Sequence, residues 1–253
     1  MTEAEARRAL RKAGKAFATV MPDVAKGKGR AYEAWVMLAL ANRLVAKGFT
    51  VDAVDSAGRP VRKLRLRKNP APMPSDSAPR SSPGHLVIWR GPYWKHELHL
   101  GMQHQGESGS LHEVDLSIIP AHPAERFRSK GGGPWAGSTC FAFELKAYDE
   151  ATKLNLGIGR GLVGVAHDLD PGRVEVEVRV RRGGRDMGTA TFGHHAARLY
   201  LVTTAGLYPD TTKLLKWHGG ATYSSVVPKS NEAPLDDLVE DMRDHHRCRW
   251  YGW

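Results

Sequence analysis

The amino-acid sequence predicts an α/β protein with a mixed central sheet of about five strands flanked by helices. Three observations lead to this fold class. Apolar residues in Arg30–Lys47 recur at helical spacing, and Gly48 follows as a residue suited to end a helix. The segments Thr139–Ala147 and Arg198–Thr203 are short and largely apolar, as buried strands are. Between them, Lys153–Leu169 has the apolar stripe of a helix, which gives the strand–helix–strand order of an α/β protein.

The other elements follow from local patterns along the chain. Alternation of apolar and charged residues predicts half-exposed strands, and clusters of glycine, proline and serine predict the turns between them. We expect a basic helix over 1–20, strands over Phe49–Val54, Val61–Lys68, His85–Trp89, Lys95–Met102, Leu111–Ile119 and Arg173–Arg181, and helices over Asp210–Trp217 and Leu235–His246.

The chain is expected to form a single domain over residues 1–253, with a core at about 30–204. Residues 69–84 are rich in proline and serine and predict an irregular, mobile loop. This loop lies within the first of two expected insertions, at 55–92 and 171–197, and a basic, aromatic tail follows the last helix over 235–253.

Composition limits the class of protein. The 253 residues are 41% hydrophobic and 25% charged, which excludes a globally disordered or fibrous chain. With only Cys140 and Cys248, no secretory signal and no apolar stretch long enough to span a bilayer, a reducing, cytoplasmic location is expected. The net charge of +10 favours a polyanionic partner over a membrane, although a basic protein without a special partner fits equally well.

Two strands combine acidic residues with an apolar opposite face. Alternate side chains on a strand share a face, so Glu144 and Lys146 lie together, and Asp115 faces away from the apolar residues of Leu111–Ile119. If these strands pair, Asp115 and Glu144 come within reach of a common cation. Two crowded carboxylates repel unless they are protonated or bridged by metal, and a hard ion such as Mg²⁺ is held by one or two carboxylates.

A third acidic residue, Glu33, lies on the expected helix. It shares one continuous face with Val36, Met37, Leu40 and Leu44, which should pack on the sheet. A buried carboxylate without a partner is costly, so a cation or hydrogen-bond donors are expected beside it.

The chain resembles the PD-(D/E)xK nuclease superfamily in the order of three features. These are a helix with Tyr32-Glu33, a hairpin strand with Asp115 and a strand with Glu144-Leu145-Lys146. The resemblance spans about Arg30–Thr204, although Val114 stands where the family motif has proline. It implies a restriction-endonuclease-like core and metal-dependent hydrolysis of phosphodiester bonds in nucleic acid, DNA more than RNA. Restriction, repair and phage defence are the settings it suggests, with a homo-oligomer or a larger defence complex left open.

The resemblance also implies a role for each site residue. Asp115 and Glu144 would hold Mg²⁺ or Mn²⁺, with the Leu145 backbone carbonyl as a further ligand. Glu33 would support the water shell of the metal or a second metal. Lys146 would orient or deprotonate the attacking water and stabilise charge on the phosphate.

Four further residues are candidates for contacting nucleic acid. Asn155 and Arg160 lie on the helix after the Glu-x-Lys strand, and Lys130 and Trp135 belong to the glycine-rich loop before it. Cationic and aromatic side chains of this kind pair with phosphates and stack on bases.

Other interpretations remain open. Glu144 with Lys146 also fits an exposed ion pair, and the chain could be a nucleic-acid-binding module without catalysis. A nucleotide-cofactor enzyme is suggested by Gly159–Gly164, which matches GxGxxG, although that motif marks a dinucleotide site only where it opens a helix directly after a strand. We interpret Gly157, Gly161 and Gly164 instead as a small-residue packing face.

Twelve histidines include His96, His99, His104 and His112 along the hairpin and His245-His246 near the C-terminus. Zinc is conceivable at either place, but neither offers two spaced pairs of ligands. We interpret these histidines as surface residues of a basic protein.

Overall fold

The computed structural model describes residues 29–91, 94–149, 151–169, 175–182, 185–193 and 197–248. The helix expected over 1–20 and the end of the expected tail, 249–253, lie outside the described residues.

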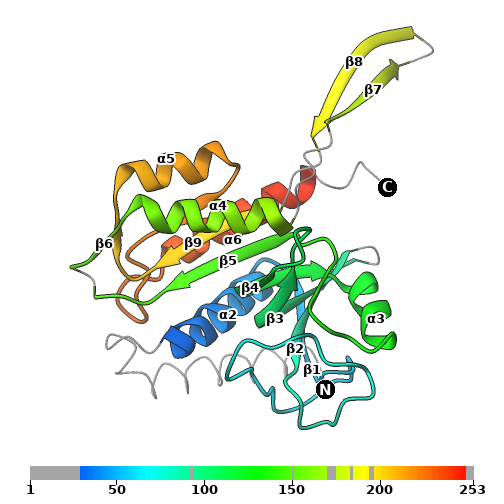
Figure 1. Ribbon diagram of the computed structural model, residues 1–253, viewed down its shortest axis with the longest axis vertical. Coiled ribbons are helices and arrows are strands. Elements are labelled where there is room, and N and C mark those ends of the chain that lie inside the picture. Colours follow the sequence, from blue (N-terminus) through cyan, green and yellow to red (C-terminus); the bar gives the residue numbers. More distant parts are fainter. Residues whose placement is uncertain are drawn as a thin grey trace.

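A seven-stranded mixed sheet forms the centre of the molecule, in the order β1-β2-β3-β4-β5-β9-β11 (Figure 1). Neighbours from β1 to β5 are antiparallel, whereas β9 runs parallel to both β5 and β11. The α/β class with a mixed sheet is therefore confirmed, and the sheet is larger than expected. Its strands are β1 Thr50–Val54, β2 His85–Arg90, β3 Trp94–Gln105, β4 Leu111–Pro120, β5 Phe141–Lys146, β9 Arg198–Thr203 and β11 Ala221–Tyr223.

Five helices lie in the described part of the chain: α2 Gly29–Ala46, α3 Ala121–Ser129, α4 Leu156–Leu169, α5 Pro209–Trp217 and α6 Pro234–Cys248. None of them is long and apolar enough to cross a membrane. Two small strand pairs complete the fold, namely β6 Lys153–Leu154 with β10 Gly206–Leu207, and the hairpin of β7 Glu175–Arg182 with β8 Arg185–Gly193.

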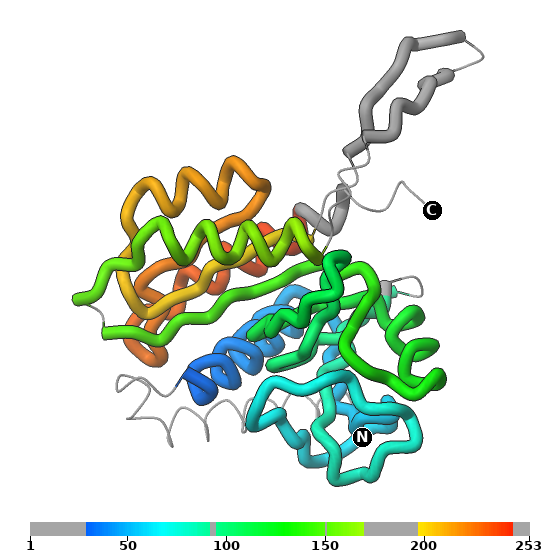
Figure 2. The backbone as a smooth tube through the Cα atoms, in the orientation of Figure 1, coloured from blue at the N-terminus to red at the C-terminus, as the bar shows by residue number. Residues whose placement is uncertain are grey.

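The helices cover both faces of the sheet, as the tube view in Figure 2 also shows. Alternate residues of β5 point to opposite faces, so Phe143 packs in the core shared with α2 and α6, whereas Ala142 packs with α4 and α5. In the same way Tyr200 and Leu201 of β9 belong to different cores. The sheet is thus the middle layer of three, and its central strands are buried on both faces.

Helix α2 matches the sequence expectation closely. Its apolar residues, and Glu33 with them, are buried against the sheet and α6. Gly48 follows with a φ of +86°, and the amide of Phe49 returns to the carbonyl of Leu44 at 3.0 Å. Glycine adopts this left-handed conformation without the steric cost of a Cβ atom, which explains the helix end.

The strand expected over Val61–Lys68 is wrong, because this segment is irregular. Leu64 and Leu66 pack partly against the core, and the guanidinium of Arg67 is buried and donates to the carbonyl of Leu100 at 3.3 Å. The alternation of apolar and basic residues therefore reflects an irregular segment that packs one side on the core, not a strand that is hydrogen-bonded to neighbouring strands.

Residues 69–84 are irregular as expected, but they are tied to the sheet. The amide of Ala71 donates to Gly101 at 3.2 Å, that of Gln103 donates to Ala71 at 3.0 Å, and the side chain of Met73 is buried. Because β2 also lies within 55–92, part of this region belongs to the central sheet, as the strand expected over His85–Trp89 requires.

Candidate active site

The candidate active site lies where β4 and β5 separate. Their ladder pairs Leu116 with Phe143 and continues toward Ile118, but on the other side of Leu116 it stops at Asp115. There the amide of Leu145 donates to Oδ2 of Asp115 at 2.8 Å. The carboxylate thus takes the place of a backbone acceptor, which fixes Asp115 beside β5 with only 7% of its surface exposed.

An irregularity between β3 and β4 lies at the same position. The pairs Leu100–Leu116 and Met102–Val114 flank Gly101 and Asp115, and Gly101 has a φ of +56°. Leu116 packs with α2 whereas Val114 packs with α4, so the strict alternation of faces breaks at Asp115. This break lets β4 carry a polar side chain toward β5 in the middle of a buried sheet.

Lys146 joins the two carboxylates on neighbouring strands. Its Nζ atom lies 2.5 Å from Oε1 of Glu144 and 3.7 Å from Oδ2 of Asp115. The exposed fractions of the Glu144 and Lys146 side chains are 26% and 30%, against 10% for Asp115. The cluster is therefore open to solvent on the side of Glu144 and Lys146 and closed behind Asp115.

Glu33 of α2 is close enough to Asp115 for their charges to interact, but among the described residues Glu33, Asp115 and Glu144 do not form a group with all ligand atoms within 4.8 Å of one another. The Glu33 side chain is 9% exposed, and Oε2 accepts a hydrogen bond from Nη1 of Arg30 at 2.5 Å. The other terminal nitrogen of Arg30 binds Oε1 of Glu113 at 2.8 Å. A Cβ atom on Gly101 would come within 2.5 Å of the Arg30 guanidinium, so glycine provides the space for this ion pair.

Arg30 and Glu113 were missed by the sequence analysis. The spacing of Arg30 and Glu33, three residues apart on one helix, is the local pattern that would have predicted their ion pair.

The carboxylates of the cluster destabilise one another. Burial, together with the charge of Asp115, raises the pKa of Glu33 to about 7 despite the opposing effect of Arg30. Burial and the charge of Glu144 raise the pKa of Asp115 to about 6. Burial alone would lower the pKa of Lys146, but Glu144 and Asp115 outweigh it and raise that pKa.

The donor set fits a hard divalent cation. Three carboxylates in a partly dehydrated site exceed the charge that Lys146 and Arg30 supply to them, and such crowding is relieved by protonation or by a metal ion. Asp115 and Glu144 offer the oxygen ligands that Mg²⁺ and Mn²⁺ prefer, on the solvent-open side of the cluster. The Leu145 amide serves Asp115, and the ligand role of its carbonyl stays a prediction.

Three of the expected nucleic-acid contacts are exposed. Asn155 directly precedes α4, and its Oδ1 atom accepts a hydrogen bond from the amide of Gly157 at 3.0 Å. Arg160 is exposed one turn further along α4, and Lys130 is exposed at the end of α3. Asn155 thus acts as a helix cap, whereas Arg160 and Lys130 are free to meet a phosphate.

The assignment of Trp135 to the nucleic-acid surface is wrong. Its side chain is 1% exposed and packs edge-on against Phe127, with ring centroids 5.3 Å apart, in a small core with Met73 and Met102. An indole enclosed in this way offers no face to a base.

The glycines of Gly159–Gly164 lie inside α4, which begins at Leu156. A Cβ atom on Gly159 would come within 3.3 Å of Thr211 and Leu214 of α5, whereas Gly161 and Gly164 face open space. Close helix packing therefore rests on Gly159, and the packing face expected from Gly157, Gly161 and Gly164 is corrected. Because the glycines do not open the helix, the arrangement differs from a dinucleotide fingerprint.

Tyr148 is an aromatic residue beside the site that the sequence analysis passed over. Its side chain is 44% exposed, its backbone is held on both sides by the hydroxyl of Thr204, and its phenol contributes to the raised pKa of Lys146. It follows β5 directly, so the strand that positions Lys146 also positions Tyr148.

The interpretation of the hairpin histidines as surface residues is wrong for two of them. His99 and His104 are 1% and 0% exposed, and His85 of β2 is 2% exposed. His112 is half-buried and paired with Asp168 of α4. The side chains of His245 and His246 lie outside the described part of the structure.

The functional argument rests on the residues of the site, because the comparisons with known proteins add nothing to it. In this chain Glu33 lies on a helix, and Asp115 and the pair Glu144 and Lys146 lie on two adjoining strands. Neither the family models nor the curated proteins nor the solved structures that were compared with the chain gave a match.

Proposed function

We propose that the protein is a Mg²⁺- or Mn²⁺-dependent nuclease that hydrolyses phosphodiester bonds in nucleic acid, DNA more than RNA. The observation that carries this proposal is the separation of β4 from β5 at Asp115. It brings the buried Asp115 next to Glu144 and Lys146, which are open to solvent, and the charge of Asp115 raises the pKa of Glu33. The same residue types in the same order underlie the resemblance to the PD-(D/E)xK superfamily.

The charges suggest how the work is divided. A divalent cation held by Asp115 and Glu144 would supply Lewis-acid chemistry, which makes hydroxide accessible near neutral pH and neutralises developing charge on a phosphate. Because its pKa is raised, Lys146 stays protonated, so its ammonium can exchange a carboxylate partner for a phosphate oxygen. This favours Lys146 as a stabiliser of phosphate charge over Lys146 as the general base.

Exposed aromatic and basic residues border the site. Tyr148 lies beside Lys146, and the loop that follows it contacts the loop of Tyr208 through the 3.0 Å hydrogen bond from Gly206 to Thr152. There the ammonium of Lys153 lies 5.9 Å from the centre of the Tyr208 ring. Aromatic rings with adjacent cations suit unpaired bases and their phosphates.

Cleavage assays test the proposal directly. Supercoiled plasmid, single-stranded DNA and RNA are incubated with the full chain in MgCl₂, MnCl₂ or EDTA. We expect metal-dependent cleavage that Lys146→Ala abolishes without weakening nucleic-acid binding more than a few-fold. Lys216→Ala, which removes an exposed lysine of α5, is the matched control and should retain activity.

The same assays distinguish the alternatives. Tight binding of nucleic acid with no cleavage of any substrate in either metal would identify a binding module of the same fold. Cleavage that survives both Lys146→Ala and Asp115→Asn would show that the activity lies elsewhere or comes from a contaminant. Thermal stabilisation by NAD or NADP, with none by Mn²⁺, would instead support a nucleotide-cofactor enzyme.

A further inference from the structure

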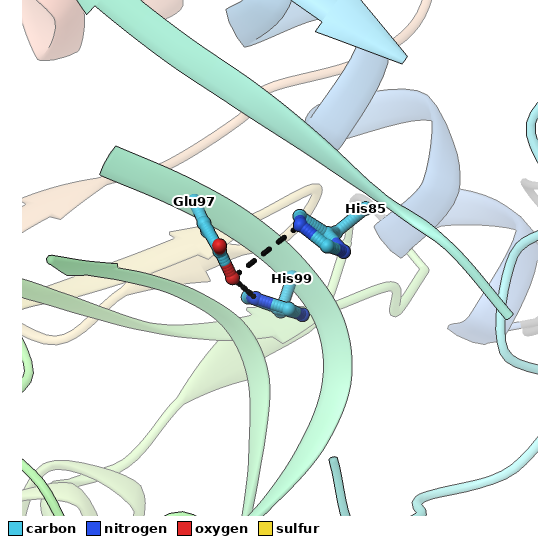
Figure 3. Close-up of side chains that lie close together, drawn as sticks. All are labelled: His85, Glu97 and His99. Atoms are coloured by element: carbon cyan, nitrogen blue, oxygen red, sulfur yellow. Dashed lines mark hydrogen bonds and ion pairs between the residues drawn. The ribbon is translucent and has the colours of Figure 1, made fainter. Parts of the chain in front are cut away.

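A second cluster of ionisable side chains lies between β2 and β3, apart from the carboxylates of the candidate active site. The register pairs Leu86 with Leu98, which places His85 opposite His99 on the same face, with Glu97 two residues along β3. The three side chains are 2%, 1% and 1% exposed. Figure 3 shows the two imidazoles side by side, both directed at the Glu97 carboxylate.

The side chains of this group lie close enough to share one cation. Nε2 of His99 lies 2.9 Å from Oε2 of Glu97, whereas Nε2 of His85 lies 3.4 Å from the same oxygen. One potential ligand atom from each residue lies within 4.8 Å of the others. Ligands bound to tetrahedral zinc at about 2.0–2.1 Å are separated by about 3.3 Å, close to the 3.4 Å of His85, whereas the 2.9 Å of His99 is a hydrogen-bond distance that would lengthen when the ion binds.

One nitrogen of the cluster is incompletely satisfied. Nε2 of His85 is buried and makes no hydrogen bond of good geometry among the described residues, and its one contact with Glu97 is the ion-pair distance of 3.4 Å. A buried polar atom without a partner costs about 1–3 kcal/mol. A bound cation would satisfy this nitrogen while keeping Glu97 and His99 in place.

A charged residue of α3 holds the carboxylate of this group in place. Arg128 of α3 binds both carboxylate oxygens, at 2.5 and 2.6 Å, and so orients Glu97 as hydrogen-bonded partners of metal ligands do.

We propose that His85, Glu97 and His99 supply three of the four ligands of a zinc site that fastens β2 to β3 and, through Arg128, to α3. Two imidazoles and one carboxylate favour Zn²⁺ over the hard cations suited to an all-carboxylate site. The positive charge of Arg128 sets a limit on affinity, so zinc binds here less tightly than in a cysteine-rich site. This inference does not depend on the nuclease proposal.

The position of the site gives it a structural consequence. His99 pairs with Ser117 across β3 and β4, two residues from Asp115 on β4. A cation that fixes His99 therefore stiffens the strand pair next to the irregularity at Gly101.

Cobalt substitution tests the site with the full chain. The double variant Asp115→Asn/Glu144→Gln removes the carboxylate ligands of the candidate active site and serves as the parent. Titration of this parent with Co²⁺ should give the intense visible absorption of tetrahedral coordination, saturate at one ion per chain, and be reversed by Zn²⁺. His85→Gln or His99→Gln added to the parent should weaken binding by about 100-fold or more.

The control is His122→Gln on α3, an exposed histidine whose loss should leave the titration unchanged. Circular dichroism checks that each variant is folded. If the His85 and His99 variants do not fold, zinc-edge X-ray absorption of the parent decides, because two imidazole nitrogens are required in the coordination shell. The proposal is overturned if the parent gives no intense absorption, if the absorption survives both histidine substitutions, or if the shell lacks nitrogen. Loss of nucleic-acid cleavage in the parent has no bearing on this result.

Discussion

Replacing Glu33 with glutamine should stabilise the metal-free protein at pH 8. The carboxylate is buried beside Asp115, and its pKa is raised from 4.5 to about 7. A shift of this size corresponds to about 3 kcal/mol of unfavourable interaction for the ionised form. Glutamine has nearly the same shape but carries no charge, so Glu33→Gln removes that cost above pH 7 and loses only the ion pair with Arg30.

The sign of the pH dependence follows from proton binding. Between pH 4.5 and about 7 the folded chain keeps a proton on Glu33 that the unfolded chain releases. The contribution of Glu33 to stability is therefore full below pH 4.5 and is lost as the pH rises through 7. The gain from Glu33→Gln should be near zero at pH 4.5 and grow to at most about 3 kcal/mol at pH 8.

Thermal and urea unfolding in EDTA measure this difference. In a domain of this size 1 kcal/mol shifts the melting temperature by about 2–4 °C, so the variant should melt up to roughly 6–12 °C higher at pH 8. Glu113→Gln removes the exposed carboxylate on the same Arg30 and should change stability by only about 0–1 kcal/mol. A melting-temperature difference that is equal at pH 5 and pH 8, or a destabilised variant at pH 8, would refute the reasoning.

Three further substitutions test other parts of the structure. Gly101→Ala places a Cβ atom at a φ of +56° and 2.5 Å from the Arg30 guanidinium. It should lower the free energy of unfolding in urea by about 1–2 kcal/mol and weaken Mn²⁺ binding. A neutral effect would contradict the role given to this glycine. The pKa of Asp168 is lowered to about 2, chiefly by its hydrogen bond with His112, so Asp168 should stabilise the fold at neutral pH. The stability advantage of wild type over Asp168→Asn should fade as the pH falls from 3.8 toward 2. A stability difference that persists at pH 2 would argue against this role of Asp168. Phe143→Ala empties a site in the main core that is 1% exposed and should cost about 3–5 kcal/mol by chemical denaturation, whereas a loss below about 1 kcal/mol would mean that the core is packed differently.

Strongly apolar elements with clear ends could be predicted well from the sequence. Helix α2 and strand β9 were expected almost at their observed bounds, because each is largely apolar and ends sharply. Helix α3 was not expected, since Ala121–Ser129 is largely polar and Pro120 provides no side-chain cap. It is stabilised by contacts that only the folded sheet supplies, such as those of Arg128 with Glu97.

The carboxylates of the candidate site could be predicted because each breaks a local apolar pattern. Glu33 interrupts a buried helix face, and Asp115 and Glu144 interrupt buried strands. The second contact of Arg30, with Glu113, could not be predicted from the sequence, because Glu113 lies 83 residues from Arg30 along the chain. The same limit applies to Trp135, whose burial depends on Phe127 and on the segment around Met73.

The buried histidines show why alternation misleads in a central strand. An edge strand, or one with a single covered face, places polar residues toward water. Glu97 and His99 alternate with Leu98 and Leu100, which suggests an exposed face. In β3 both faces are covered, one by α2 and the other by α3 and residues 69–84. Polar side chains on such a strand must find partners inside the protein, and Glu97 and His99 find them in Arg128 and His85. These polar residues of β3 therefore form a second buried polar layer, and Nε2 of His85, which makes no hydrogen bond of good geometry among the described residues, is the atom in that layer most open to a ligand.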